Sequence, residues 1–259
     1  MESHHRGQVS FVHIQKHSSK ILTRIMDIGC GTGRVSALLE KAGYDVFSFD
    51  LVFEMIRYSR TRRVLDAVVA DARKILVRNE SVELAFSLLL TLNHFGNSED
   101  FLNHFREVHR VLRRNSVYVA DMVIEQPPCN GECESWEINL DRKRYVFKYI
   151  VEESSDRYYI NVFMIICGKK KIYESRMRTF LPTFSSITDL ARRAGFNDIL
   201  YYKPFSFDKC SMGRCFAVFI KSDRHTNENG YGITLSPGTL RKSLSNDANG
   251  TSSFRAIAA

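Results

Sequence analysis

A glycine-rich turn between a short apolar run and an amphipathic stretch constrains this chain most. Residues 21–28 read ILTRIMDI, a strand-like run that ends abruptly in the turn Gly29-Cys30-Gly31-Thr32-Gly33. After the turn, apolar side chains recur at helical spacing at Val35, Leu38, Leu39 and Ala42, and Gly43 can end the helix. Because glycine lets the backbone turn sharply, the pattern predicts strand, tight turn and helix in succession.

The same alternation continues along the first half of the chain. An arginine-rich helix is predicted over residues 54–65, and a second helix begins at Ser98 as its cap and ends at Asn115. Further strands are predicted over Asp45–Phe49, Ala67–Ala70, Val82–Leu90 and Val117–Ile124. Strands that alternate with helices favour an α/β fold with a doubly wound, mostly parallel sheet. The run 82–90 is nearly all apolar, as a central strand covered on both faces should be.

The rhythm changes at residue 127. Residues 127–181 are rich in β-branched and aromatic residues, with turn signals at Ser154-Ser155-Asp156 and Gly168-Lys169-Lys170. We therefore predict an antiparallel β insertion of three or four strands. A last helix then begins at Thr183 and ends at Gly195. Strands over Ile199–Tyr202 and Cys215–Ile220 complete a seven-stranded sheet.

Composition and charge bound the protein class. The chain has 259 residues and a formal net charge of +8, which permits a polyanionic partner without requiring one. No apolar run is long enough to span a membrane, and the N-terminus lacks a secretory signal, so a cytoplasmic or nuclear location is the default. The six cysteines are then expected to be reduced thiols. We predict a flexible leader over 1–19, a folded domain over 20–222 and a disordered tail over 223–259.

The glycine turn also predicts a ligand. Its glycines allow close backbone approach, and the helix that follows presents free N–H groups. Asp50 ends the second predicted strand, where a carboxylate accepts hydrogen bonds from ribose hydroxyls. Arg34 stands where the dinucleotide pattern GxGxxG needs its third glycine, and no GK[ST] follows. These residues therefore indicate an adenosine-type cofactor without deciding which one.

Several motifs in order resemble the class I S-adenosylmethionine-dependent methyltransferase family. DIGCGTGR is similar to the family's first motif, FSFDLVFEMIRYSR to its second and VVADARKI to its third. VELAFSLLLTLNHF resembles the fourth strand, and the resemblance spans about residues 22–220. It implies a Rossmann-like fold, S-adenosylmethionine as the cofactor and methyl transfer as the activity. About 20 residues precede the first strand, fewer than in most relatives, so we expect a reduced lid or an incomplete chain.

The resemblance also implies roles for individual residues. Asp50 would hold the ribose, and Asp71 with Ala72 would meet the adenine, the carboxylate facing the exocyclic amine. The methionine half of the cofactor would lie against a set at the first motif, and two residues at the mouth of the fourth strand would pack along the cofactor. These residues are Asp27, Gly29, Gly31 and Gly33 for the first motif, and Leu88 and Leu89 for the fourth strand.

The acceptor side is less defined by the sequence. His94 follows the fourth strand and is our candidate for a base or positioning residue, whereas His104 and His109 are expected on the helix surface. The insertion resembles a substrate cap, and Trp136 and Tyr145 are candidate acceptor contacts. Alternation along strands predicts that about half of its aromatic residues point away from any pocket. Cys129 and Cys133 lack a second pair at zinc spacing, so no metal is expected.

Three functions stay open. A small-molecule N- or O-methyltransferase is favoured by the insertion, whereas an RNA methyltransferase is suggested by basic clusters. These clusters are Arg57–Arg63, Arg113-Arg114, Lys169–Lys171 and Arg192-Arg193. A cofactor-binding subunit without turnover is the third possibility. The sequence does not determine the oligomeric state or the acceptor atom.

Overall fold

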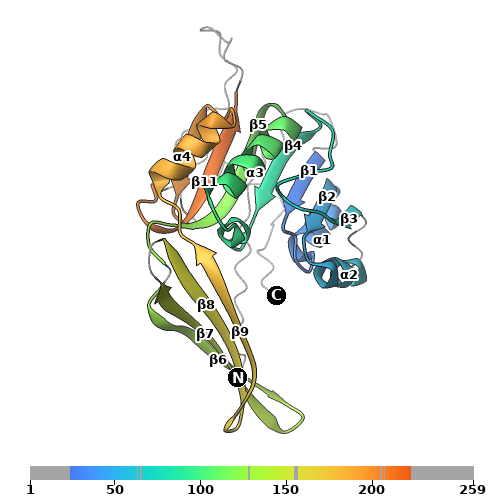
Figure 1. The fold of residues 1–259 in the computed structure, drawn as a ribbon. Helices are drawn as coiled ribbons and strands as arrows, with labels where there is room; N and C mark the ends of the chain where they lie inside the picture. Colours follow the sequence, from blue (N-terminus) through green and yellow to red (C-terminus); the bar gives the residue numbers. More distant parts are fainter. Residues whose placement is uncertain are drawn as a thin grey trace, which may run out of the picture. The chain divides into compact units, whose positions relative to one another are not determined.

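Seven strands form the main sheet in the order β10-β11-β5-β4-β1-β2-β3 (Figure 1). The structure is a computed structural model and describes residues 24–222 except 63, 65, 128, 155, 156, 205 and 207. The predicted leader and tail lie outside these residues. Strand bounds are Arg24–Ile28 (β1), Asp45–Asp50 (β2), Asp66–Val69 (β3), Val82–Ser87 (β4), Leu112–Ile124 (β5), Asp198–Tyr202 (β10) and Gly213–Lys221 (β11).

The strand directions confirm the predicted fold. Strands β1 to β5 pair in parallel, and only β11 runs antiparallel to both of its neighbours. The chain moves from β1 outward to β3 and then returns to place β4 on the other side of β1. Ligands of open α/β sheets bind beyond the carboxyl ends of the strands at such a reversal. The fold therefore brings the turn after β1 and the loop after β4 to one edge.

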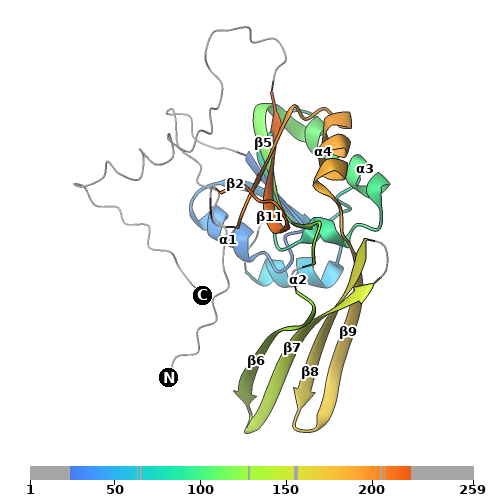
Figure 2. The ribbon, with the colours of Figure 1, turned by 90° about the vertical axis from the view of Figure 1, so that its left-hand side faces the viewer.

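Within residues 24–222 the chain forms four α-helices and one short 3-10 helix beside this sheet. Their bounds are Arg34–Lys41 (α1), Phe53–Thr61 (α2), Thr91–His94 (η1), Ser98–Val111 (α3) and Phe184–Arg193 (α4). Figure 2 shows α1 on one side of the sheet and α3 with α4 on the other. The predicted stripe of α3 is confirmed, since Phe101, Phe105 and Val108 are fully buried. No helix in the described part of the chain is long and apolar enough to cross a membrane.

The insertion is a separate antiparallel sheet of four strands in the order β6-β7-β8-β9 (Figure 1). Its bounds are Gly131–Leu140 (β6), Lys143–Ser154 (β7), Tyr158–Cys167 (β8) and Lys170–Phe180 (β9). Gly168 has φ 62° in the β8–β9 turn, which confirms that hairpin. The register pairs Trp136 with Phe147 and Tyr149 with Phe163, so these rings share one face.

Several predicted boundaries are wrong. Helix α3 ends at Val111 rather than near Asn115, because Leu112 already pairs with Val82 and starts β5. Its cap is Asn97, not Ser98, since the Asn97 side chain accepts hydrogen bonds from two backbone N–H groups of the first turn. Helix α2 ends at Thr61, four residues before the predicted end. Strand β4 ends at Ser87, because the apolar residues that follow turn away through positive φ angles at Leu89 (53°) and Leu90 (64°).

Four of the six cysteines are not reduced thiols. The structure pairs Cys129 with Cys133 and Cys210 with Cys215, at Cα separations of 5.8 and 5.9 Å. These separations lie in the range that a disulfide bridges, and the local chain geometry sets them. The expectation had rested on the presumed compartment alone, which carries no information about spacing. Cys30 and Cys167 are free thiols, as predicted.

Candidate functional site at the carboxyl edge of the sheet

The glycine turn is folded tightly against its neighbours except at its centre. Gly29 and Cys30 donate their N–H groups to the Phe49 carbonyl at 2.8 and 3.0 Å, which fastens the turn to β2. All three turn glycines have positive φ. A Cβ on Gly29 would lie 2.3 Å from Thr91, and one on Gly33 would lie 2.7 Å from Val64. A Cβ on Gly31 would meet nothing within 4 Å, so a ligand can reach the backbone there.

Asp50 is joined directly to this open position. Its Oδ2 accepts the Gly31 N–H at 2.9 Å, and its Oδ1 accepts the Val52 N–H at 2.9 Å. A carboxylate offers about four lone-pair sites, so each oxygen keeps capacity for one further donor. Two vicinal ribose hydroxyls supply such donors. Gly31 and Asp50 therefore fit the ribose end of an adenosine-type cofactor, and the Asp50 assignment stays a prediction.

Asp27 lies beneath the turn and not on its surface. The side chain is 3% exposed and accepts a hydrogen bond from the buried Ser36 hydroxyl, which in turn accepts one from Ser48 at 2.9 Å. Burial raises the pKa of Asp27 to about 7, and the negative charge of Asp50 acts in the same direction. Asp27 thus ties the end of β1 to helix α1 on either side of the turn, whereas its predicted contact with the methionine half stays a prediction.

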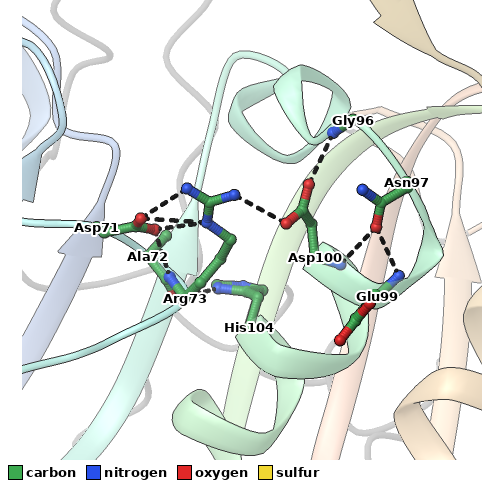
Figure 3. Close-up of polar contacts among 8 residues, drawn as sticks. All are labelled: Asp71, Ala72, Arg73, Gly96, Asn97, Glu99, Asp100 and His104. Carbon is green, nitrogen blue, oxygen red and sulfur yellow. Dashed lines mark hydrogen bonds and ion pairs between the residues drawn. The ribbon is translucent and has the colours of Figure 1, made fainter.

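The loop after β3 is held by helix α3 (Figure 3). The Arg73 guanidinium binds Asp71, with Nη2 to Oδ2 at 2.7 Å, and also binds Asp100 through Nη1 at 2.8 Å. This pairing with Arg73 lowers the pKa of Asp71. The predicted adenine contacts, Asp71 and Ala72, are therefore already ordered by neighbours that the sequence did not single out.

His104 is the second support of that loop, and the prediction that it lies on the helix surface is wrong. The ring is fully buried, with Nδ1 2.9 Å from the Ala72 carbonyl and Nε2 2.8 Å from the Tyr118 hydroxyl. Burial lowers the pKa of His104 to about 4, so the ring is neutral. A neutral ring must then donate from Nδ1 to the carbonyl and accept at Nε2. His109 is also partly buried, and its ring packs against Phe196 at 5.2 Å.

The loop after β4 is fixed by an ion pair whose carboxylate is fully buried and whose guanidinium is partly exposed. Asp121 of β5 is fully buried and binds Arg214 of β11 through two contacts of 2.8 and 2.6 Å. The same carboxylate accepts the Leu89 N–H at 3.0 Å. Leu89 itself is 57% exposed and Leu88 is partly buried, so both are accessible at this edge, and their contact with the cofactor stays a prediction. The sequence carried a weak signal for Asp121, a charged residue in an apolar strand, and none for Arg214.

His94 and its neighbour Asn93 have opposite roles in η1. Asn93 is fully buried, donates to the carbonyls of Val123 and Phe180 at 2.8 and 3.2 Å, and accepts the Val123 N–H at 2.9 Å. It therefore joins the main sheet to the end of β9. His94 is exposed, yet partial desolvation lowers its pKa, and the nearby charge of Asp50 opposes this effect. His94 thus follows β4 at the same edge of the sheet where Asp50 ends β2.

The candidate acceptor residues lie on the insertion. Trp136 stacks on Phe147 with ring centroids 5.5 Å apart, and Tyr145 stands opposite Ile138 and Cys167. The expectation that half of the insertion's aromatics point each way is wrong, since register places all but two on the same face. That face carries Trp136, Tyr145, Phe147, Tyr149, Tyr159, Phe163 and Tyr173, whereas Tyr158 and Phe180 are on the other. The roles of Trp136 and Tyr145 stay predictions.

Some residues of the predicted basic clusters are paired with nearby acids, whereas for the cluster on α2 the contacts are to a backbone carbonyl and an aromatic ring. Arg113 pairs with Glu83, Arg114 lies 3.8 Å from Glu80, and Lys171 pairs with Glu174. Arg193 lies 3.7 Å from Asp189 on the same helix. An exposed pair of this kind leaves little net positive field for a phosphate backbone. These clusters also come from separate elements of the chain, as the sequence had indicated.

Comparison with known proteins finds a match to a methyltransferase domain in the first half of the chain. Residues 26–120 match the model of the methyltransferase domain family. The malonyl-[acyl-carrier protein] O-methyltransferase of Salmonella typhimurium is 28% identical over 153 residues, which cover 55% of this chain and 59% of that protein. This chain spans 35–59% of the length of the four curated relatives that it matches.

Solved structures share the fold at low sequence identity. An S-adenosylmethionine-dependent methyltransferase from Clostridium acetobutylicum has a TM-score of 0.62 at 16% identity, over 77% of this chain and 84% of that one. The S-adenosylmethionine-bound CalS10 of Micromonospora echinaspora, an amino pentose methyltransferase, has a TM-score of 0.63 at 14% identity with the same coverage. The domain match over residues 26–120 and the sheet order with its insertion make the described residues similar in fold to class I S-adenosylmethionine-dependent methyltransferases.

Proposed function

We propose that this protein transfers a methyl group from S-adenosylmethionine to a nitrogen or oxygen acceptor on a small molecule. The observation that carries the proposal is the meeting of three groups at one sheet edge. Gly31 offers open backbone, Asp50 is hydrogen bonded to it, and His94 follows β4. The reversal of strand order supports the proposal, because the turn after β1, the end of β2 and the loop after β4 share one edge of the sheet.

The protein's part in the reaction is to bind and align. S-adenosylmethionine, when bound, supplies an electrophilic methyl group on a sulfonium sulfur. Asp50 would accept the ribose hydroxyls, and Asp71 would accept the adenine amine. The buried Asp27 keeps the turn in shape beneath them. Alignment of this kind removes much of the entropic barrier to a substitution reaction.

His94 would take the proton that a nitrogen or oxygen acceptor releases. Its lowered pKa means that the ring is neutral near pH 7 and able to accept a proton. The exposed position of its side chain leaves the ring accessible to an acceptor. The His94→Gln variant should therefore reduce turnover while binding S-adenosylhomocysteine as the unchanged protein does. Equal losses of turnover and binding would instead give His94 a structural role.

The class of acceptor is inferred from the insertion and from the surface charge. One face of the insertion is aromatic, which suits a small organic acceptor. Arg113 and Lys171 of the basic clusters are paired with acids, which weakens the case for RNA at those two clusters. Two solved structures of similar fold are described as an amino pentose methyltransferase and a sugar N-methyltransferase, and one relative is named a malonyl-[acyl-carrier protein] O-methyltransferase, so both nitrogen and oxygen are kept as acceptor atoms in the proposal.

The test begins with calorimetry using S-adenosylhomocysteine. Micromolar binding is expected, and absence of binding would refute the proposal. Purified protein is then incubated with S-adenosylmethionine carrying a labelled methyl group, together with panels of amines, hydroxyl compounds, carboxylates and bulk tRNA. Label transfer to a small molecule supports the proposal. Transfer to tRNA alone, with RNA affinity that falls steeply as salt rises, supports the RNA alternative. Binding without transfer to any panel supports a non-catalytic subunit.

A further inference from the structure

Two residues of α3, one helical turn apart, fasten the loop that follows β3. His104 holds the Ala72 carbonyl, and Asp100 holds the side chain of Arg73 (Figure 3). Asp100 is itself fixed, because its Oδ2 accepts the Gly96 N–H at 3.1 Å. Residues four apart on a helix lie on the same face, so α3 presents both supports to the loop together.

The planar guanidinium of Arg73 donates hydrogen bonds to both oxygens of the Asp71 carboxylate. Its Nη2 lies 2.7 Å from Oδ2, and its Nε lies 2.9 Å from Oδ1 and 3.1 Å from Oδ2. The Arg73 backbone N–H also donates to Oδ1 at 2.8 Å. The remaining terminal nitrogen, Nη1, reaches Asp100 at 2.8 Å. A guanidinium held at both ends sets the plane and the direction of the carboxylate that it grips.

A count of donors and acceptors shows what this arrangement leaves available. Asp71 has about four lone-pair sites, and Arg73 supplies three N–H donors to them. One acceptor site therefore remains, on a carboxylate whose side chain is 30% exposed. An amine with one free N–H would complete the set. Lysine cannot replace arginine here, because an ammonium lacks the fork.

We propose that Arg73 is a positioning residue that aims Asp71 at the exocyclic amine of adenine and so makes cofactor binding selective for a 6-amino purine. The inference rests on the proposed contact between Asp71 and the adenine. Arg73 touches neither the methyl group nor the acceptor in this scheme. Its effect is on which purine the site accepts.

The experiment compares two ligands by calorimetry. S-adenosylhomocysteine carries the 6-amino group, and its 6-deamino analogue carries hydrogen at that position. The unchanged protein should bind S-adenosylhomocysteine about tenfold more tightly, as one charge-assisted hydrogen bond implies. Arg73→Lys and Arg73→Ala should reduce this ratio to about two, because affinity for S-adenosylhomocysteine falls and affinity for the analogue does not. Asp100→Asn should give an intermediate ratio, since it weakens only the second anchor.

Two controls make the outcomes distinct. Lys74→Ala removes a neighbouring positive charge that also lowers the pKa of Asp71, and the ratio should not change. Asp71→Ala should abolish the selectivity. A selectivity that survives in Asp71→Ala refutes the adenine contact and this inference with it, while binding of S-adenosylhomocysteine would leave the proposed function intact. Two results would refute the positioning role of Arg73 and give it a structural role only. In the first, selectivity is lost in Asp71→Ala but kept in Arg73→Lys and Arg73→Ala. In the second, the Arg73 variants bind both ligands more weakly by the same factor.

Discussion

The cofactor edge of the main sheet and the antiparallel insertion are held by different kinds of contact. Beneath the glycine turn, Asp27, Ser36 and Ser48 form a chain of hydrogen bonds that is almost completely buried. The outer part of the insertion carries ion pairs such as Arg144 with Glu137, both of them exposed. Exposed pairs contribute little to stability, whereas buried polar groups are costly to disturb. Substitutions should therefore have large effects at the cofactor edge and small ones in the insertion.

The largest effect is expected from Asp27→Asn, through the pH dependence of stability. The pKa of Asp27 is raised from 3.8 to about 7 by burial, so the folded protein keeps a proton that the unfolded chain releases above pH 4. The retained proton stabilises the folded state, and this stabilisation is fully present below pH 4. As the pH rises to 7 the stabilisation is lost, and the free energy of unfolding falls by about 4 kcal/mol. Asparagine does not titrate, so the variant should lack this loss.

Urea unfolding from pH 4 to pH 8 measures that difference. Asp66→Asn, in the exposed first residue of β3, controls for the removal of one carboxylate. If the free energy of unfolding depends on pH in the same way for Asp27→Asn and the unchanged protein, burial does not raise the pKa of the Asp27 carboxyl.

The next effect concerns the joint between the two regions. Asn93→Ala removes the side chain that satisfies two groups of Val123 and the Phe180 carbonyl, and it should lower the free energy of unfolding by about 3 kcal/mol. Asn97→Ala is the matched control, since Asn97 is exposed and only caps α3, for a loss of about 1 kcal/mol. Urea unfolding of both variants provides the comparison. Similar losses would mean that the joint is no firmer than a surface cap.

A third prediction concerns the ligand and not the fold. Asp50→Ala should weaken binding of S-adenosylhomocysteine by about 1.5–3 kcal/mol, because a charged hydrogen-bond acceptor is lost. Calorimetry measures this, and Glu54→Ala, an acid in the first turn of α2, is the control. If the two variants bind equally well, the ribose is not held by Asp50.

The smallest effect is expected at the base of the insertion. The Tyr158 hydroxyl donates to the Gly96 carbonyl at 2.8 Å, and its ring packs against Phe180 and Arg178. Tyr158→Phe keeps the ring and should lower the free energy of unfolding by about 1 kcal/mol. Tyr173→Phe, in an exposed part of β9, should change nothing measurable. A loss above 3 kcal/mol for Tyr158→Phe would place the insertion with the rigid cofactor edge.

Local patterns predicted much of the fold because they depend on neighbours in the chain. The turn 29–33, the cap at Thr183 and the hairpin at Gly168 follow from local preferences and are confirmed. The end of α3 was missed because pairing between Leu112 and Val82, thirty residues apart, overrides the local signal at Asn115. His104 was wrongly predicted on the helix surface because helical periodicity does not show that Ala72 and Tyr118, from other segments, form hydrogen bonds with its two ring nitrogens.

Residues close together in the chain are enough to predict the α/β class, the glycine turn and the acid at the end of the second strand. Which side chains support these features depends on contacts between distant segments. Arg73 with Asp100, Asp121 with Arg214, and Asn93 with Phe180 join segments 27 to 93 residues apart. Such contacts depend on strand order and on burial in low dielectric, and local patterns carry no record of either.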